Sequence, residues 1–129
     1  MIDHTGFSVT NLEVSKLFYT HVLESLGHLA RLEIPEKAVG FGPARPDEGA
    51  DPGGGFWITQ GTPSTPRMHL AFSAKNKEEV DAFHCIALRS GGKDNGAPGY
   101  RPRYHSGYYA TFVLDPDGYN IEAVYHETR

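Results

Sequence analysis

Two stretches of this chain, HTGFSVTNLE at residues 4–13 and HLAFSAKNKE at residues 69–78, follow one pattern. A shift of 65 residues places His4 on His69 and aligns several further identical residues. These are Phe7 with Phe72, Ser8 with Ser73, Asn11 with Asn76, Glu13 with Glu78, Phe18 with Phe83, and Gly27 with Gly92. Two copies of one supersecondary unit restrict a fold more than any local preference does. We therefore expect a single domain over 1–129, with a first module of about 1–62 and a second of about 66–129.

Each copy has the pattern of a strand followed by a helix. In the first copy, residues 2–9 predict a short strand, and Thr10 with Glu13 has the spacing of a capping box at a helix start. Apolar residues then recur near helical period, and Gly27 follows the last of them as a terminator. This apolar stripe consists of Val14, Leu17, Phe18, Leu23 and Leu26. The second copy repeats these signals with a strand at 68–73, a cap at Asn76 and Glu79, a stripe of Val80, Phe83, Ile86 and Ala87, and Gly91 with Gly92 at the end.

Shorter β-type runs follow each predicted helix. They lie at 29–34, 38–41 and 56–59 in the first half and at 108–114 and 119–125 in the second. The turn Asp115-Pro116-Asp117-Gly118 between the last two predicts a hairpin, because Pro fixes φ and Gly accepts a positive φ. The Gly- and Pro-rich intervals 42–55 and 91–107 predict long surface loops. The expected fold is α+β, with two βαβββ modules that form a cupped, mostly antiparallel sheet and carry their helices on its outer face.

Composition limits the classes of partner. The 129 residues carry a formal net charge of −4, so there is no net basic charge to attract a phosphate backbone, and no nucleic acid is expected as a partner. No run approaches the roughly 18 apolar residues of a membrane span, so no membrane partner is expected. One cysteine among 129 residues forms no intramolecular disulfide, and the expected location is the cytoplasm. The 7 histidines are the unusual feature, since imidazole is a common ligand of catalytic metals.

Strand alternation places two of these histidines on one side of the sheet. Neighbouring residues of a strand point to opposite faces, so His4 and His69 occupy matching positions on the face without helices. On the last strand, Glu122 points away from the aliphatic and aromatic set and can join them. A buried carboxylate beside two imidazoles is costly unless a cation compensates it. His4, His69 and Glu122 are therefore candidate ligands of a divalent metal.

The chain resembles the vicinal oxygen chelate superfamily, which includes glyoxalase I, extradiol dioxygenases, and bleomycin- and fosfomycin-resistance proteins. The resemblance rests on His4 with LEVSKLFYTHVLESLG at 12–27, on MHLAFS at 68–73, and most specifically on FVLDPDGYNIEAV at 112–124. It implies paired βαβββ modules around a divalent metal, Ni, Zn, Fe or Mn, usually in a homodimer. It also implies that His4, His69 and Glu122 are the metal ligands.

Glyoxalase I enzymes add a fourth ligand, a Glu on the last strand of the first module. Here the repeat places Trp57 at that position, or Ile58 if the two Asp-Pro turns are aligned, and neither binds a metal. The resemblance favours a glyoxalase I-like lyase that acts on a small molecule chelated through adjacent oxygens, with Glu122 as its base. An extradiol-type dioxygenase is the first alternative, although Phe112 stands where those enzymes usually have Tyr. A non-catalytic small-molecule or antibiotic-binding protein is the second.

Four further residues are candidates for the substrate side of the site. His105 is a candidate acid–base group, and Trp57, Arg103 and Tyr108 are candidates for substrate binding through aromatic walls and a cation. In the alternative interpretation, the aromatic side chains belong to a core or a dimer interface, the loop arginine is solvated, and His105 is a surface residue of a tyrosine-rich segment.

Overall fold

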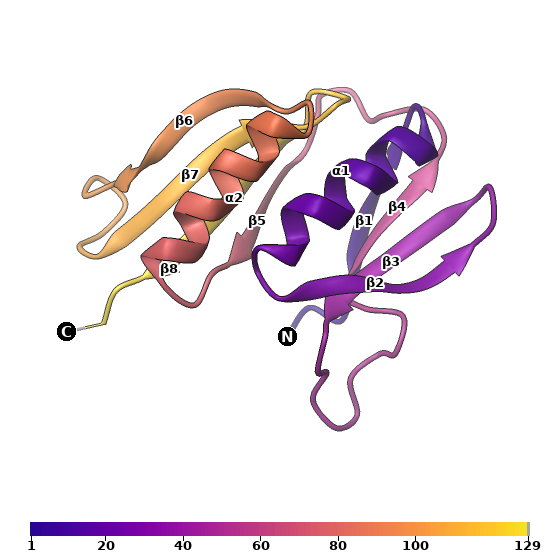
Figure 1. The fold of residues 1–129 in the computed structure, drawn as a ribbon, viewed down its shortest axis with the longest axis horizontal. Coiled ribbons are helices and arrows are strands. Elements are labelled where there is room, and N and C mark those ends of the chain that lie inside the picture. Colours follow the sequence, from indigo (N-terminus) through magenta and orange to yellow (C-terminus); the bar gives the residue numbers. More distant parts are fainter. Residues whose placement is uncertain (129) are drawn as a thin grey trace.

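The computed structural model describes residues 1–128 and contains two βαβββ modules (Figure 1). The first comprises β1 (Thr5–Val9), α1 (Leu12–Glu24), β2 (His28–Ile34), β3 (Ala38–Pro43) and β4 (Phe56–Gln60). The second comprises β5 (His69–Ser73), α2 (Lys77–Arg89), β6 (Lys93–Tyr100), β7 (Tyr108–Leu114) and β8 (Asn120–His126). The predicted α+β class and the predicted module type are confirmed.

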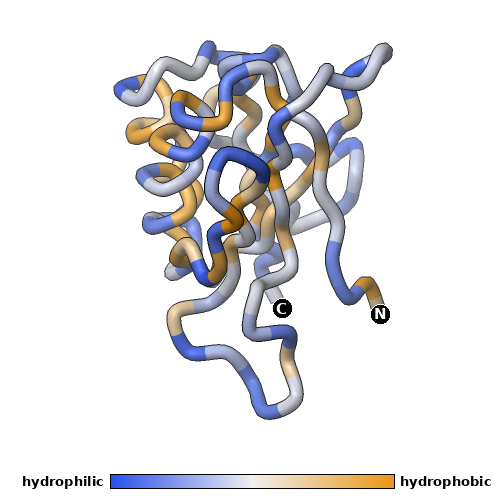
Figure 2. The backbone as a smooth tube through the Cα atoms, turned by 90° about the vertical axis from the view of Figure 1, so that its right-hand side faces the viewer, coloured by the Kyte–Doolittle hydropathy of each residue, from blue (hydrophilic) through white to orange (hydrophobic). Residues whose placement is uncertain are grey.

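Each module forms its own four-stranded sheet. The strand orders are β1-β4-β3-β2 and β5-β8-β7-β6, with one parallel pair in each sheet and antiparallel pairs elsewhere. Figure 2 shows the helices on one side of the molecule and the strands on the other, with the 44–55 loop projecting from one end. The interval 91–107, which we expected to be a loop, contains β6; the expectation was wrong because pairing with β7 overrides its Gly- and Pro-rich sequence.

Both helices begin at asparagines that occupy equivalent positions of the repeat. The side chain of Asn11 accepts a hydrogen bond from the Val14 amide, and that of Asn76 accepts one from the Glu79 amide. The cap predicted at Asn76 is confirmed, whereas α1 is capped by Asn11 rather than by Thr10. Either side chain suits an N-cap, so the sequence left this choice open by one residue.

One hydrophobic core lies between the helices and the two sheets. Phe7 and Val9 are buried on the helix side of β1, and Leu70 and Phe72 pack against the same core from β5, as strand alternation predicts. The stripe of α1 is turned from its predicted position. Its buried residues are Leu12, Ser15, Phe18, Tyr19, Val22 and Leu23, while Val14 and Leu17 are exposed.

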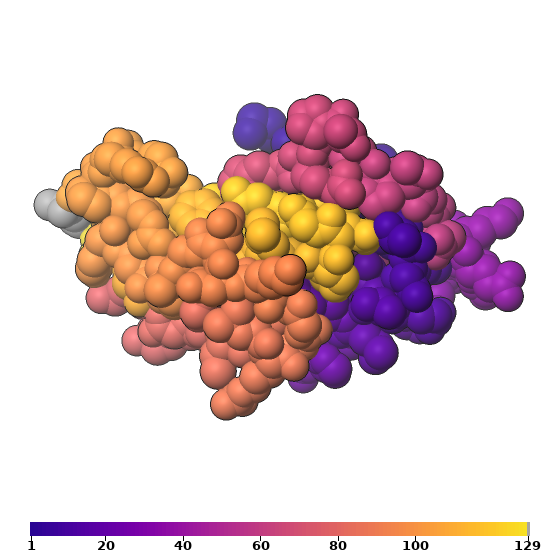
Figure 3. Space-filling model, turned by 90° about the horizontal axis from the view of Figure 1, so that it is seen from above, coloured from indigo at the N-terminus to yellow at the C-terminus, as the bar shows by residue number. Residues whose placement is uncertain are grey.

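Aromatic contacts join the modules, which lie side by side in Figure 3. The ring of Phe7 stacks on that of Tyr119 with centroids 3.8 Å apart. The hydroxyl of Tyr19 donates a 2.5 Å hydrogen bond to Asp115, the first residue of the predicted β7–β8 turn. Burial raises the pKa of the Asp115 carboxyl, although its hydrogen bonds act in the opposite direction. The turn therefore both closes the hairpin and fixes the second module against the first.

None of the helices described between residues 1 and 128 is long and apolar enough to cross a membrane.

Candidate metal and substrate site

A hollow of about 460 Å³ opens on the helix-free face of the second module. Two of the predicted ligands, His69 on β5 and Glu122 on β8, lie in it together. The pairing register places Ala71 opposite Glu122 on the adjacent strands, so His69 is two residues along β5 on the same face. The residues that line the hollow are His69, Tyr104, Tyr108, Phe112, Asn120 and Glu122.

The imidazole of His69 uses both of its nitrogens. Nδ1 lies 2.8 Å from the backbone carbonyl oxygen of Asn120, and Nε2 lies 2.9 Å from Oε1 of Glu122. A carbonyl oxygen can only accept, so Nδ1 carries the proton that it shares with Asn120. A proton on Nε2 as well would donate to Glu122, whereas the neutral ring leaves a lone pair on Nε2 that needs a cation between it and the carboxylate. This second-partner arrangement is the one that orients metal-binding histidines in proteins.

Glu122 is the buried carboxylate of the hollow, with 2% of its surface exposed. Its Oε1 faces His69, and its Oε2 accepts a hydrogen bond from the hydroxyl of Tyr108 on β7. Burial and, next, this hydrogen bond raise the pKa of the Tyr108 phenol, so the hydroxyl remains protonated and donates at neutral pH. A carboxylate this deeply buried requires such partners because desolvation is otherwise costly.

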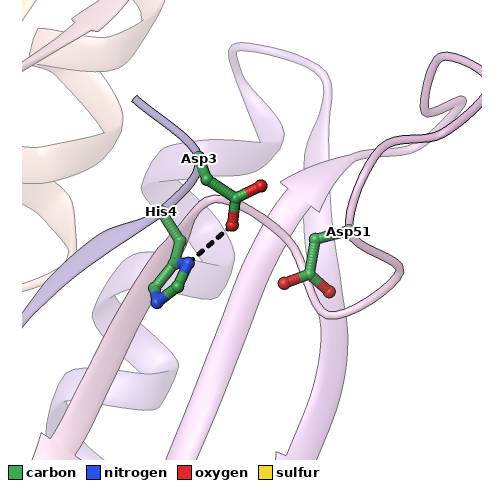
Figure 4. Close-up of side chains that lie close together, drawn as sticks. All are labelled: Asp3, His4 and Asp51. Carbon is green, nitrogen blue, oxygen red and sulfur yellow. Dashed lines mark hydrogen bonds and ion pairs between the residues drawn. The ribbon is translucent and has the colours of Figure 1, made fainter. Parts of the chain in front are cut away.

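His4 lies at the edge of the other sheet, one residue before β1 begins (Figure 4). Its Nδ1 is 2.6 Å from Oδ1 of Asp3, and Asp51 of the loop before β4 also approaches it. The hydrogen bond to Asp3, then its charge, and more weakly the charge of Asp51 raise the pKa of His4. Nδ1 of His4 is thus held by an oxygen, as Nδ1 of His69 is, and Nε2 is the ring nitrogen on the side of a metal.

The predicted ligands thus form two separate groups within one chain. Between residues 1 and 128, Asp3, His4 and Asp51 are the one set of three His, Cys, Asp or Glu side chains whose ligand atoms all lie within 4.8 Å of one another. His69 and Glu122 contact each other without His4. A site that uses all three predicted ligands is therefore not assembled by a single chain in this conformation.

Trp57 occupies the position on β4 that is equivalent to Glu122. It pairs with Gly6 on β1 as Glu122 pairs with Ala71 on β5, and both pairs are separated by the same number of residues. The indole packs over Gly40 and Gly53, where a Cβ atom would lie 2.6–2.8 Å from its ring, and its Nε1 donates to the Gly54 carbonyl. Ile58 is fully buried in the core instead. The alignment that places Trp57 at the fourth-ligand position is thus the structural one.

The other predicted residues lie around the rim or farther away. The ring of Tyr108 lines the hollow, whereas His105 lies in the β6–β7 loop with its ring against Tyr108 and its Nδ1 near the Ser106 carbonyl oxygen. Arg103 is exposed, and its guanidinium lies 5.1 Å from the ring centroid of Tyr104. Trp57 belongs to the first sheet and does not line the hollow.

Sequence reasoning did not select Asp3, Asp51 or Asn120 as parts of the site. The signal for Asp51 was its Asp-Pro pair, which matches Asp115-Pro116, and its carboxylate accepts from the Gly53 amide as Asp115 accepts from the Asp117 amide. Asn120 contributes a backbone oxygen, which no residue type reveals.

Comparison with known proteins agrees with the fold. The family model of the Glyoxalase/Bleomycin resistance protein/Dioxygenase superfamily matches residues 1–123. The chain belongs to this superfamily. A search of curated proteins gives no significant match to this glyoxalase-superfamily chain.

Several solved structures share the fold of this superfamily member. A glyoxalase/bleomycin resistance protein from Albidiferax ferrireducens T118 is 29% identical, with 96% of this chain and 97% of that chain covered and a TM-score of 0.75. A family enzyme from Burkholderia phytofirmans PsJN is 18% identical, with 98% of each chain covered and a TM-score of 0.70. A lactoylglutathione lyase from Agrobacterium tumefaciens is 20% identical, with 97% and 92% covered and a TM-score of 0.66. At these last two identities the likeness shows the fold alone.

Proposed function

We propose that this protein is a metal-dependent, glyoxalase-like lyase that acts on a small molecule with two adjacent oxygens. The observation that carries the proposal is the 2.9 Å contact between Nε2 of His69 and Oε1 of the buried Glu122, at the base of an open hollow. An imidazole nitrogen and a carboxylate oxygen suit Ni, Zn, Fe or Mn. The orientation of His69 by Asn120 and of His4 by Asp3 supports the same assignment.

The separation of His4 from His69 and Glu122 supports a site shared by two chains. In a homodimer, His4 of one chain faces the His69–Glu122 pair of the other and completes the set of three ligands. The first sheet has a surface suited to such contact, because three large apolar side chains of β2 are exposed on the face of Gly40 and Gly42. These are Leu29, Leu32 and Ile34, each 44–50% exposed. Asp51 is the carboxylate of the 44–55 loop that lies near His4 on this side of the proposed site.

His4, His69 and Glu122 would hold a divalent metal, which would supply Lewis-acid polarisation of the substrate oxygens. Glu122 is the carboxylate within the hollow, so we assign to it the transfer of a proton between adjacent substrate carbons. The rings of Tyr108 and Phe112 form the wall against which the substrate rests, and Arg103 at the rim attracts an anionic group. His105 stays a candidate acid–base group that reaches the hollow only past Tyr108.

Ring cleavage of a catechol is the second candidate reaction, and the position of Trp57 favours it. With an indole where glyoxalase I has its fourth ligand, the set His4, His69 and Glu122 is the two-histidine, one-carboxylate set typical of non-haem Fe(II) oxygenases. Metal content of protein purified without chelator separates the two reactions. Bound Ni or Zn would favour the lyase, and bound Fe would favour the dioxygenase. Assays of hemithioacetal isomerisation and of catechol consumption separate the same two reactions.

The decisive experiment is metal titration of the wild type against Glu122→Gln, monitored by calorimetry. We expect one metal per chain for the wild type and an affinity at least 10–100-fold lower for the variant, because a ligand is lost. Glu127→Gln is the matched control. Glu127 lies just beyond the end of β8, and its carboxylate contacts Tyr100 rather than His69. Equal affinities of wild type and Glu122→Gln would refute the metal site. A protein that binds no divalent metal at all would instead support a non-catalytic binding role.

A further inference from the structure

We infer that Tyr108 is a positioning residue that holds Glu122 in the orientation in which one carboxylate oxygen faces the metal. This inference rests on the proposed function, because it concerns how that site is prepared. The Tyr108 hydroxyl donates to Oε2 of Glu122, while Oε1 of Glu122 faces Nε2 of His69. The two oxygens of one carboxylate are therefore assigned to different partners.

Three other rings contact the ring of Tyr108. Tyr104, His105 and His126 each meet its ring edge-on, with centroids 4.9–5.2 Å away and interplanar angles of 61–79°. His105 and His126 in turn stack on each other with centroids 5.0 Å apart. Edge-to-face contacts of this kind restrict both the tilt and the rotation of an aromatic ring. The direction of the Tyr108 hydroxyl is thus determined before any ligand arrives.

The strand register explains why Tyr108 reaches Glu122. Tyr108 pairs with His126 across β7 and β8, and Phe112 pairs with Glu122. Tyr108 and Phe112 are four residues apart on β7, so both face the hollow, and the length of the phenol carries its hydroxyl back along β8 to the carboxylate. A shorter side chain at residue 108 would not span this distance.

A hydrogen bond from a neutral hydroxyl to a carboxylate has two effects on a metal ligand. It restricts the rotation of the carboxylate, which lowers the entropy lost when the metal binds. It also uses one lone pair of Oε2, which disfavours bidentate coordination and leaves the second lone pair for the proposed proton transfer. The hydroxyl of Tyr108 is consequently committed to Glu122, and only its ring faces the substrate. Outer-sphere partners of this kind typically contribute 10–100-fold to metal affinity.

The test is Tyr108→Phe, with Tyr109→Phe as the matched control. Tyr109 is the neighbouring tyrosine of β7, and its hydroxyl donates to Asp81 of α2 instead. We expect Tyr108→Phe to keep one metal per chain, to lower Co(II) and Zn(II) affinity by about 10–100-fold, and to change the visible absorption spectrum of the Co(II) form. Tyr109→Phe should leave the affinity and the spectrum as in the wild type. An unchanged affinity and spectrum in Tyr108→Phe would overturn the inference.

A second measurement does not require that variant to fold. Metal-free wild type, Glu122→Ala and Glu127→Gln are each labelled with ¹³Cζ-tyrosine and compared by NMR. Glu122→Ala removes the acceptor of the Tyr108 hydroxyl and should shift the Tyr108 signal, whereas Glu127→Gln should not. If the Tyr108 signal has the same chemical shift in Glu122→Ala as in the wild type, the inference is wrong. If Glu122→Gln leaves metal affinity intact in the titration above, the proposed function fails first. If Glu122→Gln weakens binding and Tyr108→Phe does not, only the positioning role fails.

Discussion

His28 is a partly buried histidine whose surroundings predict that stability depends on pH. It begins β2 and lines a second, mainly apolar hollow of about 440 Å³, whose other walls include Phe41 and Phe56 of the first module and Phe72 of the second. Its Nδ1 has no hydrogen-bond partner within residues 1–128. Burial lowers the pKa of its imidazole below 6.5, the nearby Lys75 lowers it further, and Glu79 and the Gly42 backbone act in the opposite direction. The folded state therefore favours the neutral ring.

This direction predicts an acid-sensitive contribution to folding. Because the folded-state pKa is lowered, the contribution of His28 is complete above pH 6.5 and is lost as the pH falls through the lower folded value. His28→Phe should thus flatten the pH dependence of the free energy of unfolding below pH 6.5. At pH 7.5 it should stay within about 1 kcal/mol of the wild type, because no hydrogen bond of Nδ1 is removed.

Urea unfolding between pH 5 and 7.5 measures this effect. His21→Gln, at an exposed position of α1, is the control that removes an imidazole without changing the core. If His28→Phe and the wild type lose stability in parallel on acidification, burial of His28 is not the source of the effect.

At the scale of the element, α1 has two neighbouring residues, Thr10 and Asn11, that could each cap its N-terminus. Asn11 accepts from the Val14 amide, whereas the backbone amide of Thr10 donates to Asp117 of the β7–β8 turn. Asn11→Ala should lower the free energy of unfolding by about 1 kcal/mol, since an N-terminal amide of the helix loses its acceptor. Thr10→Ala should change it by less than about 0.5 kcal/mol. Chemical denaturation of the two variants decides the matter, and a larger loss for Thr10→Ala would contradict the cap seen in the structure.

The elements that could be predicted are those whose own sequence carries the signal. Both helices have caps and an apolar stripe, and the β7–β8 hairpin has an Asp-Pro-Asp-Gly turn in which Gly118 adopts φ 87°. The sequence of β6, KDNGAPGY, favours a loop, and it becomes a strand only because β7 offers it backbone partners across two irregularities of register. Such pairing is a tertiary effect that local patterns do not contain.

For the site too, the sequence predicted what depends on position along one strand and not what depends on tertiary structure. Strand alternation correctly placed His69 and Glu122 on one face, because parity depends only on position along a strand. The same rule places His4 on the matching face of the other sheet, but parity carries no information about the distance between two sheets. Asp51 approaches His4 through the fold of a loop, and Asn120 acts through a backbone oxygen. Neither contact follows from residue type.

At the scale of the whole molecule, the exposed apolar face of β2 is the surface through which the proposed homodimer would form. Leu29, Leu32 and Ile34 lie opposite Gly42, Gly40 and Ala38 of β3, on the face away from α1. Leu32 also lies near Gly53, beside the Trp57 indole. Exposed apolar surface of this kind is typical of an interface between protein chains. It borders the half of the proposed site that contains His4, so dimer formation and metal binding should be lost together.

Leu32→Asp tests this coupling because it alters no proposed ligand. The wild type should have a mass in solution of about twice the 14.2 kDa of one chain, and the variant should have the mass of one chain. Placing charges in an apolar interface disfavours association, so metal affinity should fall by at least about 10-fold although His4, His69 and Glu122 are all retained. Leu88→Asp, at an exposed position of α2, is the matched control and should remain dimeric with wild-type affinity. Light scattering and metal titration on the same samples measure both quantities. A monomeric Leu32→Asp that binds metal like the wild type would show that each chain builds its site alone, since the ligands would then need no second copy.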